Sequence, residues 1–104
     1  MADKAVFTFG SGSLASRSSA AVVRRDVLRA IYETRDVVLD FSDVHWVAGS
    51  YADELVGVIV YQHGLDWLID HVKFHNATDG VLQSLAEAAD IRIQQRRREN
   101  HEAA

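Results

Sequence analysis

The feature that most constrains the fold is the run from Val37 to Val60, VVLDFSDVHWVAGSYADELVGVIV. Its first five residues, 37–41, show no polar alternation, which is typical of a strand covered on both faces of a mostly parallel sheet. Its second half carries apolar residues at helical spacing, namely Ala52, Leu55, Val56, Ile59 and Val60. The run therefore predicts a buried strand, a connecting loop over 42–49 in which Val44, Trp46 and Val47 tuck inward, and a helix with Ser50 as its N-cap.

The residues before this run predict another strand and another helix. Ala5–Phe9 is short and β-prone, and Gly10–Gly12 should break it. The serines in Ser16–Ser19 are suited to cap a helix. The apolar residues that follow at helical spacing are Ala20, Val23, Val27, Ala30 and Ile31. We expect this amphipathic helix to end near Thr34.

The residues after the run predict a third strand and a last helix. Leu65–Asp70 is interpreted as a further helical turn, and Val72–Asn76 as a strand. Asn76 or Thr78 should cap a helix whose apolar stripe is Val81, Leu82, Leu85, Ala86 and Ala89. The segment from Glu99 to Ala104 is predicted to be a frayed end.

Two glycines of the central region carry separate predictions. Gly57, inside the predicted helix, costs up to about 1 kcal/mol relative to Ala, and close helix–sheet packing would explain it. Gly64 is suited to end that helix.

The order β-α-β-α-β-α predicts parallel strands joined by right-handed crossovers, in a single α/β domain of 104 residues with helices packed on a small, mostly parallel sheet. The absence of Cys excludes disulfides, thiolate nucleophiles and Cys-based zinc sites. No apolar run approaches the roughly 20 residues of a membrane span, and the N-terminus lacks a signal-peptide pattern. A cytoplasmic protein is therefore expected.

Charge is distributed unevenly along the chain, whose net charge is −4. No Lys or Arg lies between Arg35 and Lys73, although the segment 36–70 holds seven acidic residues. The basic residues cluster in 17–35 and 92–98. The favoured interpretation is that segments of opposite sign are neighbours in the fold, and the alternative is an acidic face that steers a basic partner.

The segment Val37–Leu55 resembles the central part of STAS domains, the fold of bacterial anti-sigma factor antagonists. The shared pattern is an apolar strand ending in Asp, a short loop, a serine-containing turn and an apolar helix. The run Gly49–Leu55 is most similar to a divergent, uncharacterised bacterial STAS-like group, as are Gly10, Ser16-Arg17 and Phe74–Asn76. The similarity covers most of residues 5–95. The first edge strand of a full STAS domain has no counterpart here, so a smaller sheet is expected.

The resemblance implies a signalling module that binds proteins and is switched by phosphorylation. In the antagonists a kinase, which is the anti-sigma factor itself, phosphorylates a serine at the start of the helix. Their Asp-Ser-Ser aligns with Ala48-Gly49-Ser50, so the usual acceptor falls on Gly49, which has no hydroxyl. Ser50 is then the one possible phosphosite of this turn. A phosphate there would be repelled by Asp53 and Glu54, so the resemblance implies partner binding without the usual switch.

Ser50 has three interpretations, of which the helix cap is favoured and the phosphosite is second. The third is a nucleophile, since small residues lie two positions to either side of it. That alternative is a small hydrolase-like enzyme using Ser50 with His45 and Asp40. Asp40 lies near the carboxyl end of its strand, where ligands gather in open sheets, but acceptance of hydrogen bonds from the next loop is its favoured role.

The predicted function is a non-enzymatic protein-binding module. The partner, for example an anti-sigma-factor-like kinase or another regulator, would contact the loop 42–49 and the exposed face of the following helix. The candidate contact residues are Asp43, His45, Ser50, Asp53 and Glu54. A homodimer is left open.

No catalytic residue, cofactor, metal, membrane or nucleic acid is expected. His71 and His75 have the i, i+4 spacing of metal ligands on a helix, but they are placed on or beside a strand, on a solvated face. Arg92–Arg98 is a weak nucleic-acid signal on an acidic protein.

Overall fold

The computed structural model describes residues 3–10, 12–33 and 35–103, and it is a mixed α/β fold. Three parallel strands form the main sheet: β1 (Lys4–Thr8), β3 (Asp36–Asp40) and β5 (Val72–His75). They lie in the order β1-β3-β5, so β3 is central as its apolar sequence predicts. The prediction of a small parallel sheet with packed helices is confirmed.

A second, two-stranded parallel sheet was not predicted. It pairs β2 (Gly12–Leu14) with β4 (Val44–Val47), so a strand lies inside the segment predicted as a loop, and another follows the predicted break at Gly10. Val44 and Val47 are buried, but Trp46 is 53% exposed, so its predicted inward position is wrong. The register of the β2–β4 pairing shifts between Gly12 and Ser13, and this irregularity breaks the alternation, so that His45 and Trp46 are both exposed between the buried Val44 and Val47.

The helices begin and end close to the predicted positions. Their bounds are α1 (Arg17–Tyr32), α2 (Gly49–Ala52), the π-helical segment η1 (Asp53–Gly57), α3 (Val58–His63), α4 (Leu65–His71) and α5 (Asp79–Ala103). Ser16 caps α1 by accepting a hydrogen bond from the Ser19 amide at 3.3 Å. Thr78, not Asn76, caps α5, since its Oγ1 accepts from the Val81 amide at 3.2 Å. The segment predicted to fray is helical as far as Ala103.

The segments α2, η1 and α3 follow one another without a break and form one helix over residues 49–63. Gly64 ends it, as predicted, in a conformation with φ of 96° that favours glycine, and α4 starts at the next residue. This turn lets the chain fold α4 back toward β5, which α4 contacts.

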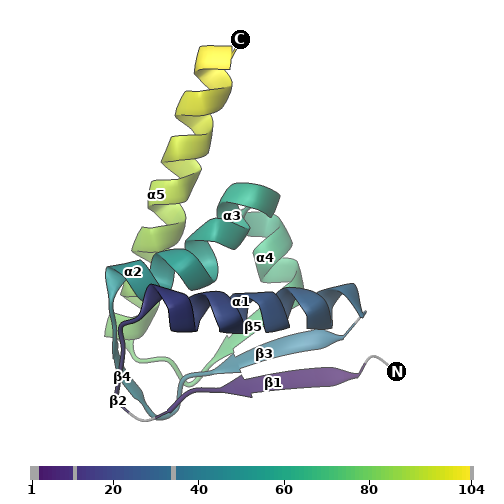
Figure 1. The fold of residues 1–104 in the computed structure, drawn as a ribbon, viewed down its shortest axis with the longest axis vertical. Coiled ribbons are helices and arrows are strands. Elements are labelled where there is room, and N and C mark those ends of the chain that lie inside the picture. The colour runs from purple at the N-terminus through teal and green to yellow at the C-terminus, as the bar shows by residue number, and fades with distance from the viewer. Residues whose placement is uncertain (1–2, 11, 34, 104) are drawn as a thin grey trace.

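The helices cover one face of the main sheet, and the second sheet lies at the end of the molecule where α2 begins (Figure 1). Ala5, Val37, Leu39 and Val72 point into the core beneath these helices. The opposite face carries the row Val6, Val38 and Lys73, in which Val6 and Lys73 are exposed. Val38 on this face is nevertheless only 6% exposed, so β3 is buried on both faces, as predicted.

The central position of β3 predicts its hydrogen-exchange behaviour. The amides of Val38 and Leu39 should exchange most slowly in the chain, because β3 pairs with a neighbour on each side. Amide exchange followed by NMR or mass spectrometry tests this. Exchange at these two residues as fast as in 99–103 would contradict it.

Candidate functional site

A cluster of charged side chains joins three helices at η1. Arg92 of α5 donates two hydrogen bonds to the Asp53 carboxylate, Nε to Oδ1 at 2.7 Å and Nη2 to Oδ2 at 2.9 Å. Arg17 at the start of α1 donates from Nη1 to Oδ2 of the same carboxylate at 2.8 Å. One acidic residue of the central helix is thus held by arginines from both ends of the chain.

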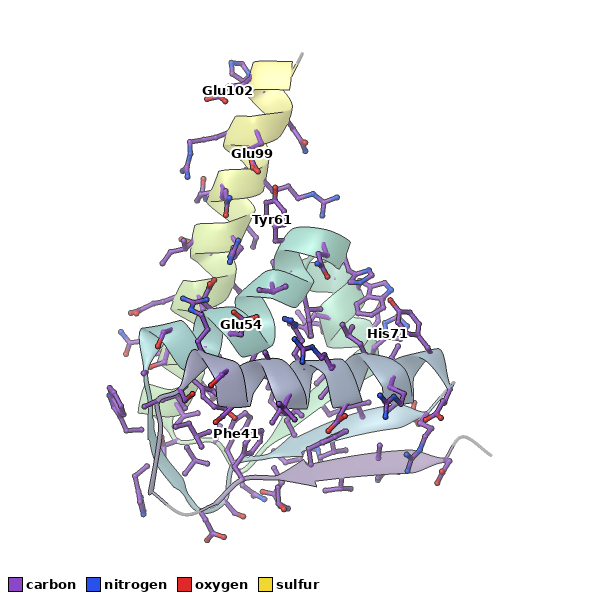
Figure 2. All side chains as sticks on the ribbon, viewed as in Figure 1. Phe41, Glu54, Tyr61, His71, Glu99 and Glu102 are labelled. Carbon is purple, nitrogen blue, oxygen red and sulfur yellow. The ribbon has the colours of Figure 1, made fainter. Side chains whose placement is uncertain are left out.

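Glu54 extends this cluster along α1 (Figure 2). Its carboxylate accepts from Arg24 Nη1 at 2.8 Å and from Arg17 Nη1 at 3.2 Å. The interpretation that segments of opposite charge are neighbours in the fold is confirmed by these pairs. The sequence did not indicate which arginines take part, because four arginines in α1 and four near the end of α5 had the same sign and a similar spacing.

The cluster fixes the charge of its members. The hydrogen bonds from Arg92, with a smaller contribution from Arg17, lower the pKa of Asp53, although burial acts in the opposite direction. The bond to Asp53 raises the pKa of Arg92. The Arg92 guanidinium also lies 5.6 Å from the ring centre of Tyr61, a cation–π distance. Asp53 is therefore a carboxylate, with no proton to donate near neutral pH.

Gly57 makes room for this cluster, one turn after Asp53. A Cβ at Gly57 would lie 2.5 Å from Asp53 Oδ1 and 3.0 Å from Arg92 Cγ. The glycine therefore allows α5 and its arginine to approach the helix, and the predicted helix–sheet packing is wrong. The five-residue π turn of which Gly57 is the last residue is a rare geometry that recurs at functional sites.

A groove of about 670 Å³ lies beside the cluster, between β4, the start of α2 and α5. Arg17, Asp53 and Arg92 form one side of it, and Glu87 and Gln95 of α5 add polar groups. Trp46 and Ile91 also line this groove, and 53% and 63% of their surfaces are exposed. We call this surface the Trp46 groove.

Ser50 does not cap the helix, so that prediction is wrong. The N-cap residue is Ala48, which has extended backbone angles and donates its amide to the Leu14 carbonyl at 2.8 Å. The pairing of β2 with β4 therefore carries the chain into the helix one residue before Ser50. The hydroxyl of Ser50 instead donates to the Ala15 carbonyl at 3.1 Å.

This placement reverses the expected order of two substitutions. At an N-cap, Ser→Ala costs more than Ser→Gly. Within the first helical turn, Ser50→Ala should change the free energy of unfolding by less than about 0.5 kcal/mol, because better helix propensity offsets one exposed hydrogen bond. Ser50→Gly should lose about 1 kcal/mol more than the Ala variant. Urea titration of both variants tests this. An Ala variant less stable than the Gly variant would show that Ser50 acts as the N-cap.

Asp40, His45 and Ser50, the three residues of the hydrolase-like alternative, lie in different surroundings and do not bind one another. Asp40 accepts hydrogen bonds from the Ser42 amide at 3.0 Å and from Asn76 Nδ2 at 3.1 Å, which confirms its predicted role in the loop. The bond from Asn76, followed by that from Ser42, lowers the pKa of Asp40. His45 is exposed on β4, and the Ser50 hydroxyl points to a backbone carbonyl. A nucleophile needs an aligned base, and among the residues that the structure describes no hydrogen bond joins the side chains of Asp40, His45 and Ser50.

The candidate contact residues divide into two groups. Asp43, His45 and Ser50 are exposed at the end of the molecule that holds the second sheet. Asp53 and Glu54 are 19% and 18% exposed and paired with arginines. Sequence reasoning did not single out Trp46, which its alternation with Val44 placed inside.

His71 and His75, which have the i, i+4 spacing, lie in different surroundings. His71 (Figure 2) ends α4, with Nδ1 2.7 Å from the Trp67 carbonyl. Its ring packs on that of Trp67, and the ring of His63 also stacks on Trp67. His75 is exposed at the end of β5. Over residues 3–10, 12–33 and 35–103, no three His, Asp or Glu side chains are grouped as a metal ion would require.

The comparisons with known proteins identify a family. The family described as "STAS-like domain of unknown function (DUF4325)" matches residues 19–82, and the chain belongs to it. The matched segment runs from α1 to the first turn of α5, so it contains η1 and both of its acidic residues. The STAS-like resemblance of the sequence is confirmed. No curated protein and no solved structure matches the chain.

The helices were also checked for a membrane span. In the part of the chain that the structure describes, no helix combines the length and the apolar character that crossing a membrane needs.

Proposed function

We propose that this chain is a non-enzymatic module of bacterial cytoplasmic signalling that binds a regulatory protein at the Trp46 groove. The observation that carries the proposal is the pair of exposed apolar side chains, Trp46 and Ile91, beside a groove with charged walls. Trp and Arg are both among the residue types enriched at binding hot spots. The STAS-like family, whose antagonist relatives bind anti-sigma factors near the same helix start, supports a protein as the partner.

In this proposal the predicted contact residues have two roles. Asp43, His45 and Ser50 are exposed in or next to β4 and α2, two elements that line the groove, and would contact the partner directly. Asp53 and Glu54 would act through Arg17 and Arg92, whose side chains they hold in the wall of the groove. A partner that buries Trp46 would also meet acceptors on Glu87 and Gln95 and donors on Arg17.

The proposal includes constitutive binding, without a phosphate at Ser50. The aligned acceptor is Gly49, and the Ser50 hydroxyl is bonded to the Ala15 carbonyl. A phosphate would add about −2 charge within one turn of Asp53 and Glu54. The intact mass of the protein purified from its own cells is expected to lack phosphate. A stoichiometric gain of one phosphate, mapped to Ser50, would show that the switch operates at this residue.

The binding proposal is tested by capture with matched variants. Wild type, Trp46→Ala, Ile91→Asp and Val22→Asp would be used as bait in extracts of the source cells, with mass spectrometry of the captured proteins. Val22 is 54% exposed on α1, so its variant adds the same charge at a similar exposure away from the groove. A specific partner should be lost with the two groove variants and kept with Val22→Asp.

The captured protein would then be titrated against each purified variant. We expect Trp46→Ala to weaken its binding by about 30-fold or more, as for a hot-spot residue. Equal affinity of all four proteins would place the partner elsewhere. Turnover of an ester or phosphoester library that is lost in Ser50→Ala would instead favour the hydrolase-like alternative.

A further inference from the structure

A second exposed surface lies on the side of α5 roughly opposite Ile91. It is a groove of about 220 Å³ between α4 and the first half of α5, lined entirely by apolar residues. The residues that matter most are Leu65 and Ile69 of α4 and Leu82, Ala86 and Ala89 of α5. Ile69 is 50% and Leu82 44% exposed. We call this surface the α4–α5 groove; exposed apolar surface of this kind marks an interaction site.

The charges along α5 change sign on the same side of the helix. Asp79 and Asp90 lie in its first half and border the apolar stripe by their helical phase, whereas Arg96 and Arg97 lie in its second half. Leu65 of the groove also lines a neighbouring hollow of about 440 Å³, whose charged residues are Arg96, Arg97 and Asp66, with a net positive balance.

These four α5 side chains are available for new contacts. Among the described residues, none of Asp79, Asp90, Arg96 and Arg97 has a hydrogen bond or an ion pair through its side chain. The arginines of the Asp53 cluster, in contrast, are all paired. The outer half of α5 extends beyond the rest of the molecule (Figure 1), and a hydrogen bond between Tyr61 and Glu99 ties it to α3.

We propose that the α4–α5 groove binds the same groove of a second copy of this chain, with the two α5 helices antiparallel. The charge pattern carries the inference. Asp79 precedes Ala86 by the same number of residues by which Arg96 follows Ala89. A two-fold axis midway between these alanines therefore places Asp79 of each copy beside Arg96 of the other copy, which gives two such contacts.

The apolar residues fit the same arrangement. Ala86 is exposed where the helices would cross, and Ala89, only 6% exposed, adds no bulk there, so two backbones can approach closely. Leu82 and Ile69 would be buried on each side of the crossing, which removes exposed apolar surface from water. A parallel arrangement would place Asp79 on Asp79 and Arg96 on Arg96, and this like-charge repulsion selects the antiparallel one.

The first test measures association of the full chain by sedimentation equilibrium. We expect a dimer whose dissociation constant rises with salt, because the end contacts are ionic. Leu82→Asp should weaken dimerisation by at least about tenfold, whereas Ile91→Asp, on the other side of the same helix, should change it less than about twofold. A monomer at all concentrations up to about 1 mM, or equal effects of the two variants, would overturn the proposal.

The second test concerns the antiparallel register. Asp79→Lys and Arg96→Glu should each weaken the dimer by at least about threefold, since each creates two like-charge contacts. The double variant restores opposite charges and should recover most of the lost affinity. Additive loss in the double variant would overturn the register. Circular dichroism of each variant checks that α5 remains helical.

These outcomes are separate from those of the proposed partner binding. Ile91→Asp should remove the captured protein and leave the dimer, while Leu82→Asp should remove the dimer and leave the Trp46 groove unchanged. Because the two variants lie on one helix and add the same charge, each serves as the control for the other. Loss of both activities in either variant would show that the two surfaces are not independent, which would overturn the dimer as proposed.

Discussion

Phe41→Ala is expected to lower the free energy of unfolding by about 3–5 kcal/mol, the range for removal of a buried aromatic ring. Phe41 has no exposed surface and lies between two other rings. Its ring centre is 4.7 Å from that of Phe9 and 6.4 Å from that of Phe74, with nearly parallel planes. Since a domain of this size is stable by only about 5–15 kcal/mol, the variant should lose much of its stability.

Urea titration followed by circular dichroism measures this loss. If the Ala variant does not fold, Phe41→Leu keeps the prediction testable, with a smaller loss of about 1.5 kcal/mol. Val22→Ala, at an exposed apolar position of α1, is the control and should change stability by less than about 0.5 kcal/mol. A Phe41→Ala variant as stable as that control would show that the three stacked rings do not support the end of β3.

Gly57→Ala is expected to lower the free energy of unfolding by about 1–3 kcal/mol, the cost of inserting a methyl group into packed surroundings. Helix propensity alone predicts the opposite sign, a gain of up to about 1 kcal/mol. The contacts decide between them, because the new Cβ would lie 2.5 Å from an Asp53 oxygen that Arg92 holds in place. Either the carboxylate or the arginine must move.

Gly80→Ala is the matched control, because Gly80 is also helical and, beyond its own helical backbone and chain neighbours, nothing lies within 4 Å of the added Cβ. It should gain about 0.5–1 kcal/mol, so the two glycines should respond with opposite signs. The cause is tested in an Asp53→Ala background, where Gly57→Ala should cost less than in wild type. If Gly57→Ala stabilises the protein as Gly80→Ala does, the close approach of Arg92 is not a constraint.

The parts of the fold that the sequence predicts are those set by local chemistry. An apolar run with no alternation identified β3, and the polar caps predicted in Ser16–Ser19 and at Asn76 or Thr78 marked the starts of α1 and α5, where Ser16 and Thr78 are the residues that cap. Gly64 marked the end of α3 because a left-handed conformation favours glycine. Each of these signals acts over a few residues, so no knowledge of the tertiary arrangement was needed.

The parts that could not be predicted depend on distant residues. β2 has three residues, and the weak alternation in β4 was interpreted as a loop, because nothing in the sequence shows that the two segments pair. That pairing moved the helix start to Gly49, so Ser50, a residue with a strong preference for caps, has a different contact. Trp46 is exposed for the same reason. Opposite charges in separate segments indicated that pairs exist, but the π turn that presents Asp53 and Glu54 has no recognised sequence signal.

Arg17 and Arg92, from the two ends of the chain, share the carboxylate of Asp53. The three positions should therefore tolerate mutation to different degrees. If either arginine is lost, the carboxylate is still neutralised by the other. If Asp53 is lost, Arg92 loses its carboxylate partner and Arg17 keeps only its 3.2 Å contact with Glu54, while the charge of Arg17 already disfavours that of Arg92. Natural variation should therefore be freer at Arg17 than at Asp53, and a change at Asp53 should survive mainly when one of the two cations changes with it.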